Sequence, residues 1–356
     1  MLRGLAASLV VFHHVCQAVE SSSPRLSFIN SLYGLSKFGA VGVDIFFVIS
    51  GFIMVFLTTD PRRKQLGAFE FLRMRIIRIV PLYWIYTTAM LFLVASPFAF
   101  RAHTFGWSFI LKSYLFIPGY NSSGKLHPLL DQGWTLNYEM YFYLIFTAFL
   151  GIARPKAVAY MSLAMAGSIT IAFAFPLNFA PYTFFTEPIV LEFCLGMLAG
   201  ILYNRGSLPN RKLTIAFLTL ALAIWALTIR FSFDMKYRFV FSGIPAFSVV
   251  LALLALEKQG RLPKSSSWLL LGDASYSIYL THAFFTLALA AALKTHMAAV
   301  IPSMDLLIVA AIPLFLLPGI LSYRFLEQPL TKWLRTVATQ QSKNVPHGDN
   351  KHHVLI

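Results

Sequence analysis

Ten long apolar segments set the strongest limit on how this chain can fold. Each covers roughly 16–24 residues, and about 20 apolar residues are needed for a helix to cross a bilayer. Only helices and closed barrels satisfy all their backbone hydrogen bonds in lipid. The pattern predicts an all-α polytopic integral membrane protein with about ten transmembrane helices, near residues 2–19, 41–58, 80–98, 136–152, 157–175, 188–203, 213–230, 239–256, 269–292 and 305–323.

The composition excludes an ordinary soluble domain. The residues are 58% hydrophobic and 12% charged, against about 25% charged in soluble proteins. A net charge of +15 would suggest nucleic acid in a soluble protein, but here the basic residues lie mostly between apolar segments, as the positive-inside rule describes. We therefore expect the lipid bilayer as a partner, and no nucleic acid. Cys16 and Cys194 lie in apolar runs, and no metal is predicted because a structural zinc needs about four ligands.

The distribution of basic residues also predicts the topology. If the N-terminus is inside, 20 of the 29 Lys and Arg residues fall on the inner side, so both termini are expected in the cytoplasm. Residues 1–335 form one predicted transmembrane domain. Residues 336–356 are polar and are expected to be a disordered cytoplasmic tail.

Five ionisable residues fall inside the predicted spans, in the middle or outer half of the membrane. A charge at this depth costs at least about 2.5–3.5 kcal/mol, which makes each one a functional candidate. The alternative for each is a structural hydrogen bond between helices. The five are His14, Asp44, Glu139, Glu192 and His282.

The first span places Arg3 and His14 on one helical face. The two residues are 11 positions apart, which is about 1100° of rotation and only about 20° from a whole number of turns. Arg3 is expected at the cytoplasmic rim and His14 deep in the membrane. His13 is rotated by about 100° from His14 and faces elsewhere. His14 is therefore the stronger candidate for chemistry, with a packing histidine as the alternative.

A second constellation is basic and lies on the predicted cytoplasmic side. Arg75 and Arg78, at i and i+3, share a helical face next to Pro81. Two guanidinium groups on one face suit a phosphate or pyrophosphate. The alternative is that these residues only set the topology, together with the neighbouring Arg62, Arg63, Lys64 and Arg73.

At this point the motifs carry a family resemblance. In order along almost the whole chain, they resemble those of the bacterial membrane acyltransferase family 3, in its exopolysaccharide-production O-acetyltransferase branch. The hallmark is an Arg, ten intervening residues and a His, which corresponds to Arg3 and His14. The other stretches are Asp44–Phe52, Arg75–Arg78 with Val80–Trp84, Gln132–Glu139 with Tyr141–Tyr143, Ser275–His282 and Glu327–Pro329.

The resemblance implies an acyl-CoA-dependent enzyme of the bacterial inner membrane. Acetyl-CoA would be the donor, and a sugar hydroxyl of an exopolysaccharide or its lipid-linked precursor the acceptor. The nucleotide end of CoA would bind Arg75 and Arg78, with Arg3 nearby. His14 would act as general base or accept the acetyl group transiently, because a histidine pKa of about 6.5 suits either role.

Further side chains have expected roles around this centre. Asp44 or Glu139 would orient the imidazole, as a carboxylate does in a catalytic triad. Trp134 and Tyr138 would stack on sugar rings, with an interfacial aromatic belt as the alternative. His282 is a candidate substrate-binding residue. Glu327 is expected to pair with the arginines or to end a helix exposed.

Two other functions stay open on sequence alone. A transporter of lipid-linked sugars would also carry acids and arginines inside the membrane. An O-acyltransferase acting on lipopolysaccharide, peptidoglycan or another glycan would show nearly the same motifs. The oligomeric state cannot be read from the sequence.

Overall fold

The computed structural model describes residues 1–23, 27–31, 35–59, 67–96, 105–230, 237–262, 265–295 and 300–343, and this part of the chain is helical without a strand. The elements are α1 Leu2–Ser22, α2 Phe28–Ser31, α3 Leu35–Phe38, α4 Val41–Thr59, α5 Ala68–Ala95, α6 Trp107–Tyr114, η1 Asp131–Gly133, α7 Trp134–Ala148, α8 Arg154–Ala174, α9 Ala180–Phe185, η2 Pro188–Val190, α10 Leu191–Asn204, α11 Arg211–Arg230, η4 Phe239–Gly243, α12 Ile244–Lys258, α13 Ser266–Asp273, α14 Ser275–Leu293, α16 Met304–Ser322, η5 Tyr323–Glu327 and α17 Gln328–Lys343.

The helices confirm a polytopic membrane protein. Within the described residues, eight helices are long and apolar enough to cross a membrane, and a shorter apolar helix covers 188–204. A helix lies at each of the ten predicted positions, but α7 has only 15 residues. The number of spans and the cytoplasmic location of the termini therefore stay predictions.

Two predicted segments differ from the helices. The span predicted at 80–98 is the second half of α5, which begins at Ala68, because arginine and methionine are good helix formers and continue the helix beyond its apolar part. The span predicted at 269–292 is divided at Ala274 into α13 and α14. The break lets α13 lie against the start of α1, where a side chain in place of Gly4 would meet Leu271.

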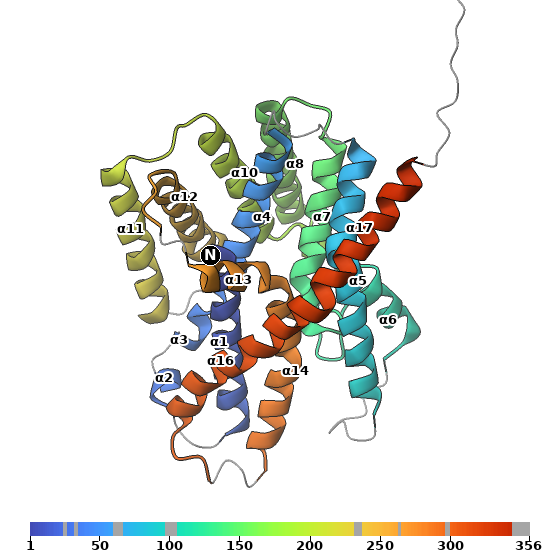
Figure 1. Ribbon diagram of the computed structural model, residues 1–356, viewed down its shortest axis with the longest axis vertical. Coiled ribbons are helices and arrows are strands. Elements are labelled where there is room, and N and C mark those ends of the chain that lie inside the picture. Colours follow the sequence, from blue (N-terminus) through green and yellow to red (C-terminus); the bar gives the residue numbers. More distant parts are fainter. Residues whose placement is uncertain are drawn as a thin grey trace, which may run out of the picture.

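Helix α1 lies at the centre of the described bundle and carries the hallmark residues. It packs against α4, α13, α14 and α16, with Ala6, Ala7 and Val10 completely or almost completely buried. Figure 1 shows its first residue well inside the bundle, far below the upper ends of α4 and α5. The expected position of Arg3 at the cytoplasmic rim stays a prediction.

The C-terminal helix α17 continues the line of α16 across the bundle. The π-helical turn η5 joins the two without a break, and α17 crosses α5 in the upper part of Figure 1. The Nη1 atom of Arg73 donates a hydrogen bond of 3.1 Å to the carbonyl of Ala338. Because α17 is helical to Lys343, the expected tail from residue 336 begins inside a helix. Residues 344–356 lie outside the described residues, as do Arg62, Arg63 and Lys64.

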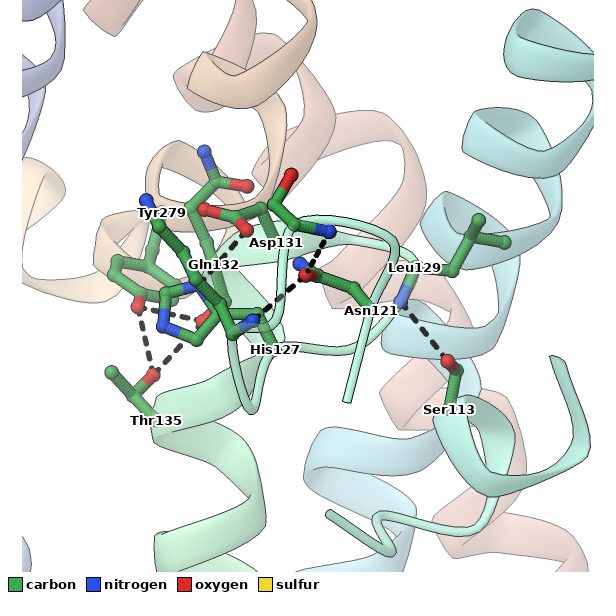
Figure 2. A network of polar contacts seen from close by, with 10 residues as sticks. Ser113, Asn121, His127, Leu129, Asp131, Gln132, Thr135 and Tyr279 are labelled. Carbon is green, nitrogen blue, oxygen red and sulfur yellow. Dashed lines mark hydrogen bonds and ion pairs between the residues drawn. The ribbon is translucent and has the colours of Figure 1, made fainter. Parts of the chain in front are cut away.

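The loop between α5 and α7 is held in place by hydrogen bonds to its own short helix. Tyr83 donates from α5 to the carbonyl of Ser113 at 2.9 Å. Ser113 in turn accepts from the backbone N–H of Leu129 at 3.0 Å (Figure 2). These bonds fix the segment that ends in η1, just before Trp134.

Helices α4 and α10 touch through glycine. A Cβ atom on Gly196 would collide with the carbonyl oxygen of Val48, and one on Gly51 with that of Phe193. Backbones at this distance leave no room for a side chain, as in other small-residue contacts between membrane helices.

We expect Gly196→Leu to destabilise the protein by about 1–3 kcal/mol, because overpacking forces the two helices apart. Gly167→Leu is the matched control, since nothing lies within 4 Å of a Cβ at that helical position. Thermal unfolding of the detergent-solubilised protein measures the difference. Equal midpoints for the two variants would show that this contact is not tight.

Candidate active site

Two adjoining cavities lie beside the predicted arginines. The larger has a volume of about 1370 Å³ and is lined by residues of α1, α4, α12, α13 and α17. The smaller has a volume of about 570 Å³ and lies among α4, α5, α7 and α14. Both are lined by the same five residues, Arg3, Ile49, Ile53, Arg78 and Arg335.

The structure brings the three predicted arginines together at these cavities. Arg3 and Arg78 line both cavities, and Arg75 lines the smaller one. The Arg75 guanidinium carbon lies 5.5 Å from the centre of the Phe71 ring and 6.0 Å from that of Tyr143. Its buried Nε has no hydrogen-bond partner among the described residues. The face shared by Arg75 and Arg78 thus points into a cavity.

Glu139 belongs to this arginine group. It accepts hydrogen bonds from Ser50 at 3.2 Å and from the hydroxyl of Tyr143. Its carboxylate lies within electrostatic reach of Arg3 and Arg75, and it lines the smaller cavity. The structure places Glu139 with the predicted donor-binding residues, and its described hydrogen bonds do not involve His14.

Glu327 joins the same group from the other side. Its buried carboxylate accepts a hydrogen bond of 2.6 Å from Ser277. It also lies within electrostatic reach of Arg3 and Arg78. The expected proximity of Glu327 to the arginines is therefore present, and the residue is buried within a continuous helix instead of ending an exposed one.

His14 lies further along α1 with a defined tautomer. Its Nδ1 is 2.9 Å from the carbonyl oxygen of Val10. Because a carbonyl only accepts, Nδ1 carries the proton and Nε2 keeps its lone pair. The side chain is half-buried. His13 points elsewhere, as the helical phase predicts, and its Nδ1 lies 2.6 Å from the carbonyl of Ser36.

The ring of His282 lies next to that of His14. The ring centres are 4.9 Å apart, although the residues come from α1 and α14. The Nδ1 of His282 lies 3.2 Å from the carbonyl of Ile278, so it too donates to the preceding helical turn. Its Nε2 is buried and has no partner among the described residues. Two imidazoles thus keep Nε2 lone pairs available, and an unsatisfied buried acceptor is costly unless a ligand donates to it.

Asp44 has a different partner from the one expected. Both its oxygens accept 2.8 Å hydrogen bonds from the guanidinium of Arg238, and the carboxylate is completely buried. Arg238 also donates to the carbonyl of Ala40 at 3.1 Å. Glu192 is completely buried beside this pair. The arrangement ties α4 to the start of η4 and gives Asp44 no described hydrogen bond to His14.

Tyr138 is also placed differently from the sugar-binding expectation. It is 3% exposed, stacks on Phe184 with ring centres 4.0 Å apart, and donates to the carbonyl of Phe184 at 2.8 Å. A ring enclosed in this way has no free face for a sugar. Trp134 is half-buried, and the ring of His127 lies parallel to it at 5.7 Å.

The sequence reasoning missed two polar residues of the loop before α7. His127 and Asp131 form a hydrogen bond of 2.9 Å, drawn in Figure 2. Asp131 lies within electrostatic reach of His14. Partial burial opposes ionisation of Asp131, but the hydrogen bond and charge of His127 outweigh it and hold the pKa of the carboxyl below its usual value. The irregular segment between α6 and η1 gave no periodic signal for this placement.

Tyr279 stands between the smaller cavity and the histidines. Its ring lines that cavity and lies 5.7 Å from the ring of His282. Its hydroxyl donates to the carbonyl of Gln132 at 2.9 Å and lies 2.7 Å from the hydroxyl of Thr135. Figure 2 shows these bonds joining α14 to the loop and the start of α7.

Among the described residues no group of three or more His, Cys, Asp or Glu side chains is placed to hold a metal ion. No solved structure matches the chain significantly.

Three characterised relatives are similar over most of the chain. The exopolysaccharide production protein ExoZ of Rhizobium meliloti is 36% identical over 83% of this chain and 90% of its own length. Nodulation protein 10 of Rhizobium leguminosarum bv. viciae is 28% identical over 79% of this chain and 80% of its own. The acyltransferase MdmB of Streptomyces mycarofaciens is 23% identical over 79% and 76%.

The family comparison covers both histidines, the three predicted arginines and Glu139, whereas Glu327 and the α17 residues that line the cavities lie beyond it. The sequence model described as acyltransferase domain, of acyltransferase family 3, matches residues 1–323. This chain therefore belongs to the acyltransferase family 3 membrane proteins.

Proposed function

We propose that the protein is a membrane O-acyltransferase that transfers an acetyl group from acetyl-CoA to a sugar hydroxyl of an exopolysaccharide or its lipid-linked precursor. The observation that carries the proposal is the arginine-lined pair of cavities, together with two histidines that hold their Nε2 lone pairs available. Membership of an acyltransferase family favours an enzyme over a transporter.

The donor site is proposed at the cavities. Phosphates suit guanidinium groups, which bind them with two parallel hydrogen bonds, and Arg3 and Arg78 stand where the cavities meet. The nucleoside of acetyl-CoA would occupy the larger cavity. Its pyrophosphate would lie where the cavities meet and bind Arg3, Arg75 and Arg78, and its arm would enter the smaller cavity toward Tyr279. Glu139 would hold Arg3 and Arg75 in place rather than touch the reacting atoms.

The proposed chemistry is direct transfer with His14 as general base. The Nε2 of His14 takes the proton of the sugar hydroxyl, whose oxygen attacks the thioester carbonyl carbon. The new C–O bond forms, the C–S bond breaks, and the proton passes from His14 to the departing thiolate of CoA. His282 would accept a hydrogen bond from the sugar and so orient it.

The acceptor is proposed to enter from the outer side, which carries the loop with His127 and Asp131. Of the carboxylates in the spans and this loop, Asp131 acts electrostatically on His14, so it replaces Asp44 as the group that favours an imidazolium there. The name of the relative ExoZ supports an exopolysaccharide acceptor. The predicted topology supports the bacterial inner membrane, with acetyl-CoA arriving from the cytoplasm.

We expect His14→Ala to lower acetyl transfer by about 10²–10⁴-fold, the usual contribution of a general base. The assay follows labelled acetyl groups from acetyl-CoA into polysaccharide in isolated membranes. His13→Ala is the matched control and should transfer at nearly the wild-type rate, since its imidazole is engaged by the Ser36 carbonyl. Full transfer by a correctly folded His14→Ala variant would remove His14 from the mechanism.

We expect Arg75→Ala and Arg78→Ala each to raise the KM for acetyl-CoA by roughly 10–100-fold, because a hydrogen bond to a charged group contributes about 1.5–3 kcal/mol. Steady-state transfer rates in membranes at varied acetyl-CoA measure this change. Arg205→Ala is the control, since this exposed arginine lines neither cavity. If the KM values of the first two variants equalled that of the control, the donor would have to bind elsewhere.

A further inference from the structure

Helix α17 turns a wholly polar face toward the larger cavity. Its lining residues recur every three to four positions, so they occupy one side of the helix. None of these lining residues is apolar, whereas most of the protein's other helices consist mainly of apolar residues. The residues are Gln328, Thr331, Lys332, Arg335, Thr336 and Gln340.

This face is fixed over the cavity by contacts on the rest of the helix. The π-helical turn η5 continues α16 into α17, so its start cannot move independently. Near its other end, Arg73 of α5 donates to the carbonyl of Ala338, and the Ala338 side chain is 9% exposed. The polar face is consequently a wall of the cavity and not a loose tail.

The charges on this wall extend the arginine group. Lys332 lines the larger cavity alone, whereas Arg335 lines both cavities, as Arg3 and Arg78 do. Three carboxylates also line the larger cavity, Glu257 of α12, Asp273 of α13 and Glu327 of η5. Glu327 is bonded to Ser277 and lies near Arg3 and Arg78. The side of the cavity formed by α1, α5 and α17 is therefore the basic one.

We propose that α17 is part of the acyl-donor site, in which Arg335 binds the pyrophosphate of CoA and Lys332 binds the 3′-phosphate of its ribose. The assignment rests on the proposed donor, acetyl-CoA. It follows from position: Arg335 lies where the cavities meet, beside Arg3 and Arg78, and Lys332 lies in the cavity large enough for the nucleotide. The family match ends at residue 323, before α17 begins.

The proposal is tested by equilibrium binding of CoA and of 3′-dephospho-CoA to the purified full-length protein in nanodiscs of neutral lipid. We expect Lys332→Ala to weaken CoA binding about tenfold, equivalent to about 1.4 kcal/mol, and to leave dephospho-CoA binding unchanged. Arg335→Ala should weaken both ligands. Lys332→Arg should retain the preference for CoA, because it keeps the charge.

Arg324→Ala is the matched control, since it removes one positive charge from an exposed position of η5 that lines neither cavity. If wild-type protein binds CoA while Lys332→Ala and Arg335→Ala bind it as Arg324→Ala does, the α17 site is wrong and the proposed function stands. If wild-type protein binds no CoA, the proposed function is wrong and this inference fails with it. If the two α17 variants lose only the binding of anionic lipid vesicles, the wall is a lipid headgroup site, which also overturns the proposal.

Discussion

A charge in the apolar interior of a membrane protein needs a partner, and this requirement divides the buried charges of the protein into two kinds. Asp44 and Arg238 neutralise each other through two hydrogen bonds and hold α4 against η4. Arg3, Arg75 and Arg78 instead face cavities with Glu139 and Glu327 close by. The first kind fixes the fold. The second retains positive charge toward open space, which an anionic ligand would neutralise.

The two histidines depend on ordinary helix geometry for their orientation. In each, Nδ1 donates to the carbonyl four residues earlier, Val10 for His14 and Ile278 for His282. That bond sets the tautomer and the direction of the ring at once. The protein needs no carboxylate contact to orient either imidazole. This is why the acids expected to do so, Asp44 and Glu139, are engaged in other pairings.

Local sequence patterns predicted what a single helix determines. The positions of the ten predicted spans follow from the lengths of the apolar runs. The shared face of Arg3 and His14 and the separate direction of His13 follow from helical phase. The partner of Asp44 is Arg238, which lies 194 positions away in the sequence. His14 and His282 come from different helices, α1 and α14. Asp131 and His127 come from a loop whose path is set by hydrogen bonds to α6. No local pattern encodes such contacts. The polar spacing along α17, in contrast, is a local pattern, and it predicts a helix.

The central claim is that an acyl donor bound in the arginine-lined cavities presents its thioester, past Tyr279, to the histidine pair. The most direct measurement is an experimental structure of the protein with bound CoA. We expect the pyrophosphate beside Arg3, Arg78 and Arg335, and the arm entering the smaller cavity with the thiol directed past Tyr279 toward His14 and His282. Phosphates bound away from the arginines, or a thiol directed away from the two histidines, would contradict it.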